Sequence, residues 1–261
     1  MPDSRDRTAI VTGASSGNGR AIARRLSADG IRVVCADLKP TARSDGFEKD
    51  LDVPTHEAII QSGGKATFVT CDVTQMTDIE KAISVAVDVF GSADILVNNA
   101  GVFTGLASIF DETEDAFDQA VAVNLKGVWN GCKAMATHLR REGKPGRIIN
   151  IASVGGLVGI GNEPGYCATK GAVVNLTRAV ALDCADHRIA VNAVCPGFIV
   201  TGMVREFVEQ PDVLEVMRQA TPWPRFGKPE DVAEVCAFLS AEAADWMTGA
   251  IIPVDGGFTA R

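Results

Sequence analysis

The sequence predicts a single α/β domain with a doubly wound, seven-stranded parallel sheet and helices on both faces. Short β-branched runs alternate with longer segments of helical period along all 261 residues, which is typical of this fold class. The runs are apolar at nearly every position, as expected for parallel strands that are covered on both faces. No internal repeat and no linker rich in Pro, Gly or Ser divides the chain, so we expect one domain over residues 1–261.

The predicted elements alternate regularly along the chain. Helices are predicted where apolar residues recur every three or four positions, and the last one opens with a proline and two acids, which favour a first helical turn. The segment 40–54 is polar and irregular and is assigned to no element. Strands are predicted at residues 8–12, 32–36, 67–70, 94–97, 147–151, 190–194 and 251–255, and helices at 18–29, 75–89, 114–141, 164–186 and 229–240.

The charges of the chain exclude several classes of partner. It carries 25 basic and 33 acidic side chains, a net charge of −8, and the basic residues are scattered, which disfavours nucleic acid and anionic membranes. No apolar run approaches the ~18 residues of a membrane span. The first residues lack the basic-then-apolar pattern of a secretion signal. We therefore expect a cytoplasmic protein.

The seven cysteines and three histidines form no metal-binding pattern. The cysteines are odd in number and include no CxxC pair, so neither a disulfide framework nor a zinc site is expected. We expect no metal site. The cysteines lie mostly in apolar runs and are predicted to pack as small hydrophobic side chains.

A glycine-rich loop follows the first predicted strand. Residues 12–19 read Thr-Gly-Ala-Ser-Ser-Gly-Asn-Gly and lead into a helix, so that a pyrophosphate could approach the backbone N–H groups at the positive helix end. An ordinary strand-to-helix turn is the alternative. Asp37 closes the second strand, where an acid would accept hydrogen bonds from an adenosine ribose and oppose a 2′-phosphate. This favours NAD over NADP, although Lys39 is close enough to weaken the preference, and a solvated strand end is the alternative for Asp37.

Tyr166 is the only tyrosine in the chain. It lies four residues before Lys170, so the two share a face of the predicted helix. A phenol has a pKa of ~10, and a neighbouring ammonium together with an oxidised nicotinamide could lower it enough for proton transfer near neutral pH. Ser153 follows the strand at 147–151 and would emerge at the carboxyl end of the sheet. A buried tyrosine beside a chance lysine is the alternative.

These residues, taken together, resemble the short-chain dehydrogenase/reductase family over essentially the whole chain. The similarity is to its NAD-type members, such as glucose 1-dehydrogenase, and to 3-oxoacyl reductase. The glycine loop resembles the family's TGxxxGxG motif and the Tyr166–Lys170 pair its YxxxK motif. Further matches are residues 98–101 (Asn-Asn-Ala-Gly), Pro196-Gly197 with Thr201, and residues 255–257 (Asp-Gly-Gly).

The resemblance implies a Rossmann-type fold and hydride transfer between NAD and a secondary alcohol, such as a cyclic alcohol, a polyol or a sugar hydroxyl. Tyr166 would be the general acid/base, Ser153 would orient the substrate oxygen, Lys170 would also bind the nicotinamide ribose, and Asn124 would hold a water that connects Lys170 to solvent. An amide at a helix bend is the alternative for Asn124. The implied cofactor-binding residues are Gly13, Ser15, Ser16, Gly17, Asn18, Gly19, Asp37, Leu38, Asp72, Val73, Asn99, Ala100, Gly101, Tyr166, Lys170, Pro196, Gly197, Ile199 and Thr201.

Several parts of this pattern leave alternatives open. Asn18 occupies a position that is usually aliphatic, and segment 40–54 fits the family poorly, although it could be a surface loop near the cofactor. Asp72, implied to contact adenine, could instead cap the next helix, as could Thr74. Residues 102–107, 154–164 and a lid at 202–223 would line the substrate site, with polar candidates Thr104, Asn162, Glu163, Arg205 and Glu206. The alternative for the lid is an ordinary surface helix.

Two other functions compete with the NAD-dependent dehydrogenase. One is an NADPH-dependent biosynthetic carbonyl reductase, such as a 3-oxoacyl reductase, which Asp37 disfavours. The other is a non-catalytic dinucleotide-binding sensor, since fold alone does not give function. The resemblance also implies a homotetramer assembled through the helices at 114–141 and 164–186 and the last strand.

Overall fold

One parallel sheet runs through the centre of the molecule. The computed structural model describes residues 7–48, 50–205 and 209–260. The strands are β1 Thr8–Thr12, β2 Arg32–Asp37, β3 Ala66–Thr70, β4 Ile95–Asn98, β5 Gly146–Ile151, β6 Ile189–Pro196 and β7 Ile251–Val254. They are ordered β3-β2-β1-β4-β5-β6-β7, and all neighbours are parallel. This confirms the predicted fold class and each predicted strand, with ends that differ by one or two residues.

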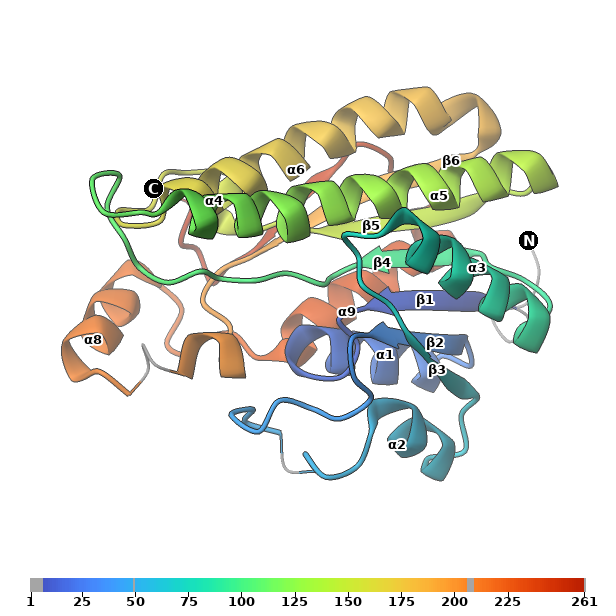
Figure 1. Cartoon of the computed structure of the whole chain (residues 1–261), viewed down its shortest axis with the longest axis horizontal. Helices are drawn as coiled ribbons and strands as arrows, with labels where there is room; N and C mark the ends of the chain where they lie inside the picture. The colour runs from blue at the N-terminus through green and yellow to red at the C-terminus, as the bar shows by residue number, and fades with distance from the viewer. Residues whose placement is uncertain (1–6, 49, 206–208, 261) are drawn as a thin grey trace.

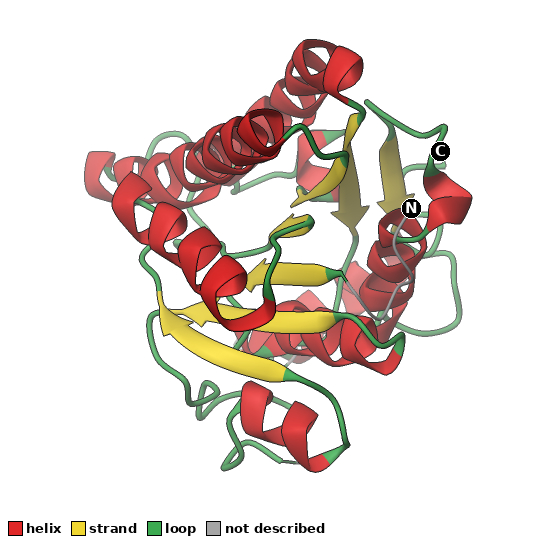
Figure 2. Cartoon of the chain, turned by 90° about the vertical axis from the view of Figure 1, so that its right-hand side faces the viewer, coloured by secondary structure: helices red, strands yellow, loops and turns green. Residues whose placement is uncertain are grey.

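Helices cover both faces of the sheet (Figures 1 and 2). The α-helices are α1 Gly17–Ala28, α2 Thr55–Gln61, α3 Met76–Phe90, α4 Glu114–Ala120, α5 Gly127–Glu142, α6 Pro164–Cys184, α8 Pro211–Ala220 and α9 Pro229–Ser240. A π-helical turn, η2 (Val121–Lys126), joins α4 to α5, and short 3₁₀ turns include η3 (Val154–Gly156) and η5 (Gly202–Val204). In the described part of the chain, no helix combines the length and apolarity needed to cross a bilayer.

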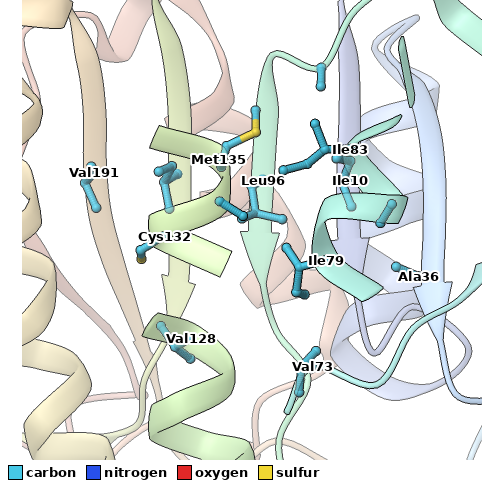
Figure 3. Packing of buried hydrophobic residues seen from close by; sticks show 14 of the residues in the cluster. Ile10, Ala36, Val73, Ile79, Ile83, Leu96, Val128, Cys132, Met135 and Val191 are labelled. Atoms are coloured by element: carbon cyan, nitrogen blue, oxygen red, sulfur yellow. The ribbon is translucent and has the colours of Figure 1, made fainter. Parts of the chain in front are cut away.

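The core consists of two apolar layers, one on each face of the sheet. Side chains alternate between the faces along a strand, so Ile10 of β1 packs in one layer and Val11 in the other. The first layer lies under α3, α5 and α6 and includes Ile79 and Met135 (Figure 3). The second lies under α1 and α9. Six of the seven cysteines are buried, as expected for small apolar side chains.

Helix α2 is absent from the predicted set. It is seven residues long, which is too short for a clear helical period. Tertiary contacts hold its start, because the buried Arg20 guanidinium donates to the Val53 carbonyl oxygen at 2.9 Å and to Thr55 Oγ1 at 3.0 Å. In the preceding polar segment, 40–54, the described residues form no helix or strand, in keeping with its irregular sequence.

Two local interpretations of the sequence need correction. The predicted continuous helix at 114–141 is interrupted by the π-helical turn η2, which contains Asn124. Helix α3 begins at Met76 with Gln75 at the N-cap, so the capping role considered for Asp72 or Thr74 is wrong. Asp72 Oδ1 instead accepts hydrogen bonds from the N–H and the hydroxyl of Thr74, at 2.9 and 2.8 Å. This places Asp72 in an Asx turn before the helix.

Candidate active site

The predicted site residues gather where the strand order of the sheet reverses. Strands β1 and β4 are neighbours, and the chain leaves them toward opposite sides of the sheet, which creates a crevice at their carboxyl ends. The loop after β1 carries Gly13, and the loop after β4 carries Asn99. The two loops are joined because the Asn99 side chain donates to the Thr12 carbonyl oxygen at 2.9 Å.

Close backbone packing explains the glycines of the first loop. Gly13 has a φ of +63°, and a Cβ built on it would lie 2.9 Å from the Cα of Ala100. A Cβ on Gly19 would lie 2.0 Å from the Gly13 carbonyl oxygen. Side chains at these positions would therefore push the two loops apart, whereas glycine leaves the backbone N–H groups at the start of α1 accessible to an anion.

Asp37 is held at the end of β2 next to the glycine loop. Its carboxylate accepts hydrogen bonds from the backbone N–H of Ser15 at 2.9 Å and of Leu38 at 2.7 Å. The Ser15 hydroxyl donates to the carbonyl oxygen of Lys39 at 2.5 Å. A fixed carboxylate at this place is an acceptor suited to ribose hydroxyls and repels a phosphate.

The donor and acceptor groups of the crevice fit a nicotinamide dinucleotide. Besides the glycine loop and the Asp37 carboxylate, Asn18 Oδ1 is buried and has no hydrogen-bond partner within the described residues. A buried polar atom without a partner is costly unless a ligand or water completes it. Asn18, the residue that departs from the family pattern, is thus a candidate to contact the dinucleotide.

The outer cofactor candidates lie on both sides of the glycine loop. Beyond β3, the Val73 carbonyl oxygen accepts a hydrogen bond of 2.8 Å from the Asn130 side chain of α5, which fixes Asp72 and Val73 at the sheet edge. Beyond β6, a Cβ on Gly17 would lie 3.4 Å from Thr201 Cγ2. Segment 196–201, which contains Pro196, Gly197 and Ile199, therefore lies beside the loop, whose remaining candidate is Ser16.

Tyr166 and Ser153 meet above the end of β5. Ser153 caps the turn η3, since its hydroxyl oxygen accepts the Gly155 N–H at 3.1 Å, and its side chain acts to lower the pKa of the Tyr166 phenol. The Tyr166 ring, near the start of α6, packs edge-on against Phe103 with ring centroids 5.3 Å apart. The Ser153 hydroxyl and the Tyr166 phenol thus lie at the same end of the sheet.

Burial dominates the pKa of Tyr166 in the structure. It raises this pKa to about 12, although the Ser153 hydroxyl acts in the opposite direction. Burial also lowers the pKa of Lys170 to about 8. Burial thus opposes the lowering of the Tyr166 pKa that we expect from the Lys170 ammonium together with an oxidised nicotinamide.

Lys170, Asn124 and Gly101 form a buried polar cluster behind Tyr166. Lys170 Nζ donates to the Ile151 carbonyl oxygen at 2.9 Å and lies 5.7 Å from the centre of the Tyr166 ring. Asn124 binds both backbone polar groups of Val102, at 2.8 and 2.9 Å. A Cβ on Gly101 would lie 3.1 Å from Asn124 Oδ1 and 3.6 Å from Lys170 Nζ, so glycine keeps the two side chains close together.

The predicted substrate segments are partly brought together. The Ala107 N–H donates to the Asn162 carbonyl oxygen at 2.9 Å, which joins segments 102–107 and 154–164, and the half-exposed Thr104 lies in the first of them. Burial raises the pKa of Glu163 to about 7, and this carboxyl also raises that of Tyr166. The predicted lid contains η5 and α8, but Glu206 lies outside the described residues.

Sequence reasoning missed Glu48 in the unassigned segment. Its carboxylate accepts a hydrogen bond from the backbone N–H of Gly17 in the glycine loop. No motif signals this contact, because 31 residues separate the two positions and the loop that carries Glu48 has no regular period.

Comparisons with known proteins agree with this geometry. The family model described as "Enoyl-(Acyl carrier protein) reductase" matches residues 13–259. A 2-(R)-hydroxypropyl-CoM dehydrogenase of Xanthobacter autotrophicus is 39% identical over 257 residues, which cover 97% of this chain and 99% of the relative. A levodione reductase of Leifsonia aquatica is 34% identical over 263 residues, which cover 98% of this chain and 95% of the relative.

The solved structures agree as well. A structure from Agrobacterium tumefaciens, provisionally described as a 2-deoxy-d-gluconate 3-dehydrogenase with bound NADP, superposes with a TM-score of 0.87 at 35% identity and covers 98% of this chain and 97% of its own. The family match covers residues 13–259 of this chain, and the alignments with these relatives span nearly the full length of both chains. The chain belongs to the short-chain dehydrogenase/reductase family of oxidoreductases.

Proposed function

We propose that the protein is an NAD(H)-dependent oxidoreductase that interconverts a secondary alcohol and its carbonyl compound. The observation that carries this proposal is the cluster of Ser153, Tyr166 and Lys170 at the carboxyl end of the sheet, beside the glycine loop. The names of the hydroxypropyl-CoM dehydrogenase and the levodione reductase support chemistry at an alcohol or carbonyl carbon. A cyclic alcohol, a polyol or a sugar hydroxyl remains the proposed substrate class.

The side chains have distinct roles in this proposal. Ser153 holds the substrate oxygen, and Tyr166 donates its proton to that oxygen as a carbonyl is reduced, or removes the proton as an alcohol is oxidised. When bound, the nicotinamide supplies the hydride donor or acceptor and, when oxidised, a positive charge. With a pKa of about 12, Tyr166 is ready to act as an acid, whereas its action as a base requires a lower pKa.

Lys170 and Asn124 support the phenol from behind. Lys170 holds the nicotinamide ribose, and its proton is available near neutral pH because burial lowers its pKa to about 8. The Asn124 amide donates one N–H to the Val102 carbonyl oxygen and accepts the Val102 N–H with its oxygen. Its second amide hydrogen and a second oxygen lone pair are therefore available to bind a water. This water would link Lys170 to solvent.

Asp37 favours NAD, and one observation favours NADP instead. The carboxylate is fixed beside the glycine loop, where it would repel a 2′-phosphate. Two structural relatives, however, are described with bound NADP, so an NADPH-dependent carbonyl reductase is the second candidate. For this candidate Lys39, whose carbonyl oxygen contacts Ser15, or residues of segment 40–54 would receive the phosphate.

Titration with NADH and NADPH at one ionic strength tests the cofactor proposal. We expect NADH to bind at least tenfold tighter, a difference of ~1.4 kcal/mol, and Asp37→Asn to reduce this ratio because it removes the repelling charge. Glu80→Gln, an exposed acid on α3, is the matched control and should keep the wild-type ratio. Equal or tighter binding of NADPH would put the NADPH-dependent reductase first, and binding without turnover of any alcohol or carbonyl would favour the sensor.

The proposal also concerns how the protein assembles. We propose a homotetramer built through α4, η2 and α5, through α6, and through the edge strand β7, since Phe117, Trp129 and Leu182 leave large exposed apolar area on these helices. Mass measurement in solution checks this, and a monomer contradicts it.

Residues 202–223 are proposed to cover the substrate. A cytoplasmic location is also proposed for the protein, and cell fractionation checks it.

A further inference from the structure

Glu48 places a negative charge on the helix end where the glycine loop is suited to bind phosphate. The Gly17 N–H at the start of α1 donates to Glu48 Oε1. The other carboxylate oxygen is buried and has no hydrogen-bond partner among the described residues. Anions are stabilised at a helix N-terminus by the free N–H groups and by the helix dipole. Glu48 therefore supplies the kind of charge that a pyrophosphate would bring to this position.

The loop that carries Glu48, residues 43–48, is tied to the start of the predicted lid. Arg205 Nε donates to the Asp45 carbonyl oxygen at 2.6 Å, and Nη2 donates to that of Gly46 at 2.9 Å. The guanidinium also stacks on the Phe47 ring, 4.0 Å from its centre. One arginine thus holds three consecutive residues of the loop, directly before Glu48.

The packing of Gly202 shows that the two segments are in close contact. A Cβ on Gly202 would lie 2.8 Å from Asp45 Oδ1 and 3.1 Å from the Asp45 carbonyl oxygen. Thr201, one residue earlier, lies beside Gly17. The 43–48 loop and residues 201–205 therefore meet over the N-terminus of α1, and Glu48 lies between them and the glycine loop.

The contacts that hold this arrangement are weaker than those of the core. Arg43 and Asp45 form an ion pair whose side chains are 59% and 38% exposed, and such pairs contribute little to stability. The buried Glu48 oxygen without a partner costs energy. A ligand that satisfies the Gly17 N–H and returns Glu48 to water can replace these contacts.

We propose that Glu48 and Arg205 form a latch that occupies the pyrophosphate position and has to open before a dinucleotide binds. Glu48 is the internal competitor of the phosphate, and Arg205 couples its release to the movement of residues 201–205, which contact the 43–48 loop. The latch rests on the proposed dinucleotide-dependent function. If only the open form binds the dinucleotide, the apparent affinity is the affinity of the open form multiplied by the fraction of molecules that are open.

Binding measurements on the full-length protein test the latch. Glu48→Gln keeps the size of the side chain and removes its charge, so we expect NADH to bind about tenfold tighter than to the wild type, because the closed form is depopulated. Arg205→Ala should shift the affinity in the same direction, since it frees the same loop. Glu80→Gln, with the same change of charge on exposed α3, should bind NADH like the wild type.

Limited trypsin digestion without added nucleotide gives a second measurement. Opening of the 43–48 loop exposes the bond after Arg43, so we expect Glu48→Gln and Arg205→Ala to be cut there several-fold faster than the wild type, with unchanged circular dichroism. Equal or weaker NADH binding by Glu48→Gln together with unchanged cleavage would overturn the latch while leaving the proposed function standing. Failure of the wild type and of both variants to bind NADH or NADPH would overturn the proposed function itself.

Discussion

The surroundings of Tyr166 and those of Glu48 are stabilised in different ways. Behind Tyr166, Lys170 and Asn124 are 4% and 0% exposed, and they hydrogen-bond to the backbone of β5 and of the loop after β4. Around Glu48, irregular loop residues meet through Arg205 and through exposed ion pairs. Buried polar groups must be satisfied, so the first region has one arrangement, whereas the second can change at low cost. The proposed chemistry needs fixed positions, and the entry of a large cofactor needs a part that moves.

Removal of the Tyr166 hydroxyl is the largest effect expected from the rigid region. Tyr166→Phe should lower kcat by about 10²–10⁴-fold, the usual contribution of a general acid or base, because the ring contact with Phe103 is kept and only the proton donor is lost. Steady-state kinetics with an alcohol or ketone that the wild type turns over measures this change. The affinity for NADH should stay within a factor of two or so of wild type. Unchanged turnover would overturn the mechanism.

Asn150→Ala examines how strongly the rigid region depends on buried hydrogen bonds. Asn150 accepts from the Asn98 side chain at 2.8 Å and donates to the Thr177 hydroxyl at 3.0 Å, and it joins β4, β5 and α6. The variant removes both hydrogen bonds and leaves Asn98 with only its weak contact to Cys132 Sγ at 3.6 Å, so the free energy of unfolding should fall by about 2–4 kcal/mol. Urea denaturation measures the loss. Glu48→Gln is the matching variant in the other region and should change the free energy of unfolding by less than about 1 kcal/mol. Equal losses of stability in the two variants would contradict the distinction between a rigid region around Tyr166 and a weakly held one around Glu48.

Glu163→Gln should have a smaller effect than Asn150→Ala, and one that depends on pH. Burial raises the pKa of Glu163 to about 7, above that of the unfolded chain, so the folded state holds the proton more tightly. The resulting stability is fully present below about pH 4.5 and is lost as the pH rises through about 7. The variant should therefore be more stable than the wild type at pH 8, by about 1–2 kcal/mol after screening by solvent, and nearly equal to it at pH 4.5.

The same variant should change the pH profile of the reaction. Besides burial, the Glu163 carboxylate raises the pKa of Tyr166, so the neutral amide should shift to lower pH the ascending limb of the pH profile of kcat for alcohol oxidation, where Tyr166 loses its proton. Unfolding curves and pH–rate profiles of the two proteins provide the measurements. A variant that is less stable than the wild type at pH 8, with an unshifted profile, would show that the Glu163 carboxyl is not the group that opposes ionisation of Tyr166.

Local sequence patterns predicted most of the fold and most of the site. The alternation of β-branched runs and helical periods placed all seven strands, because parallel strands covered on both faces must be apolar throughout. Motif spacing placed Gly13, Asp37, Ser153 and Tyr166 at the ends of strands or at the start of a helix, which the structure brings to one edge of the sheet. Helix α2 escaped prediction because it is short and is held by the distant Arg20.

The sequence by itself determined the fold class and the strand or helix ends on which the candidate residues lie, since both follow from short-range periodicity and from spacing within one element. Only the tertiary structure decided the burial that raises the pKa of Tyr166, the π-helical setting of Asn124 and the contact of Glu48 with Gly17. A pKa depends on burial, and burial is produced by elements from all parts of the chain. The Glu48 contact joins an irregular loop to a helix end through space, and such a contact leaves no period in the sequence.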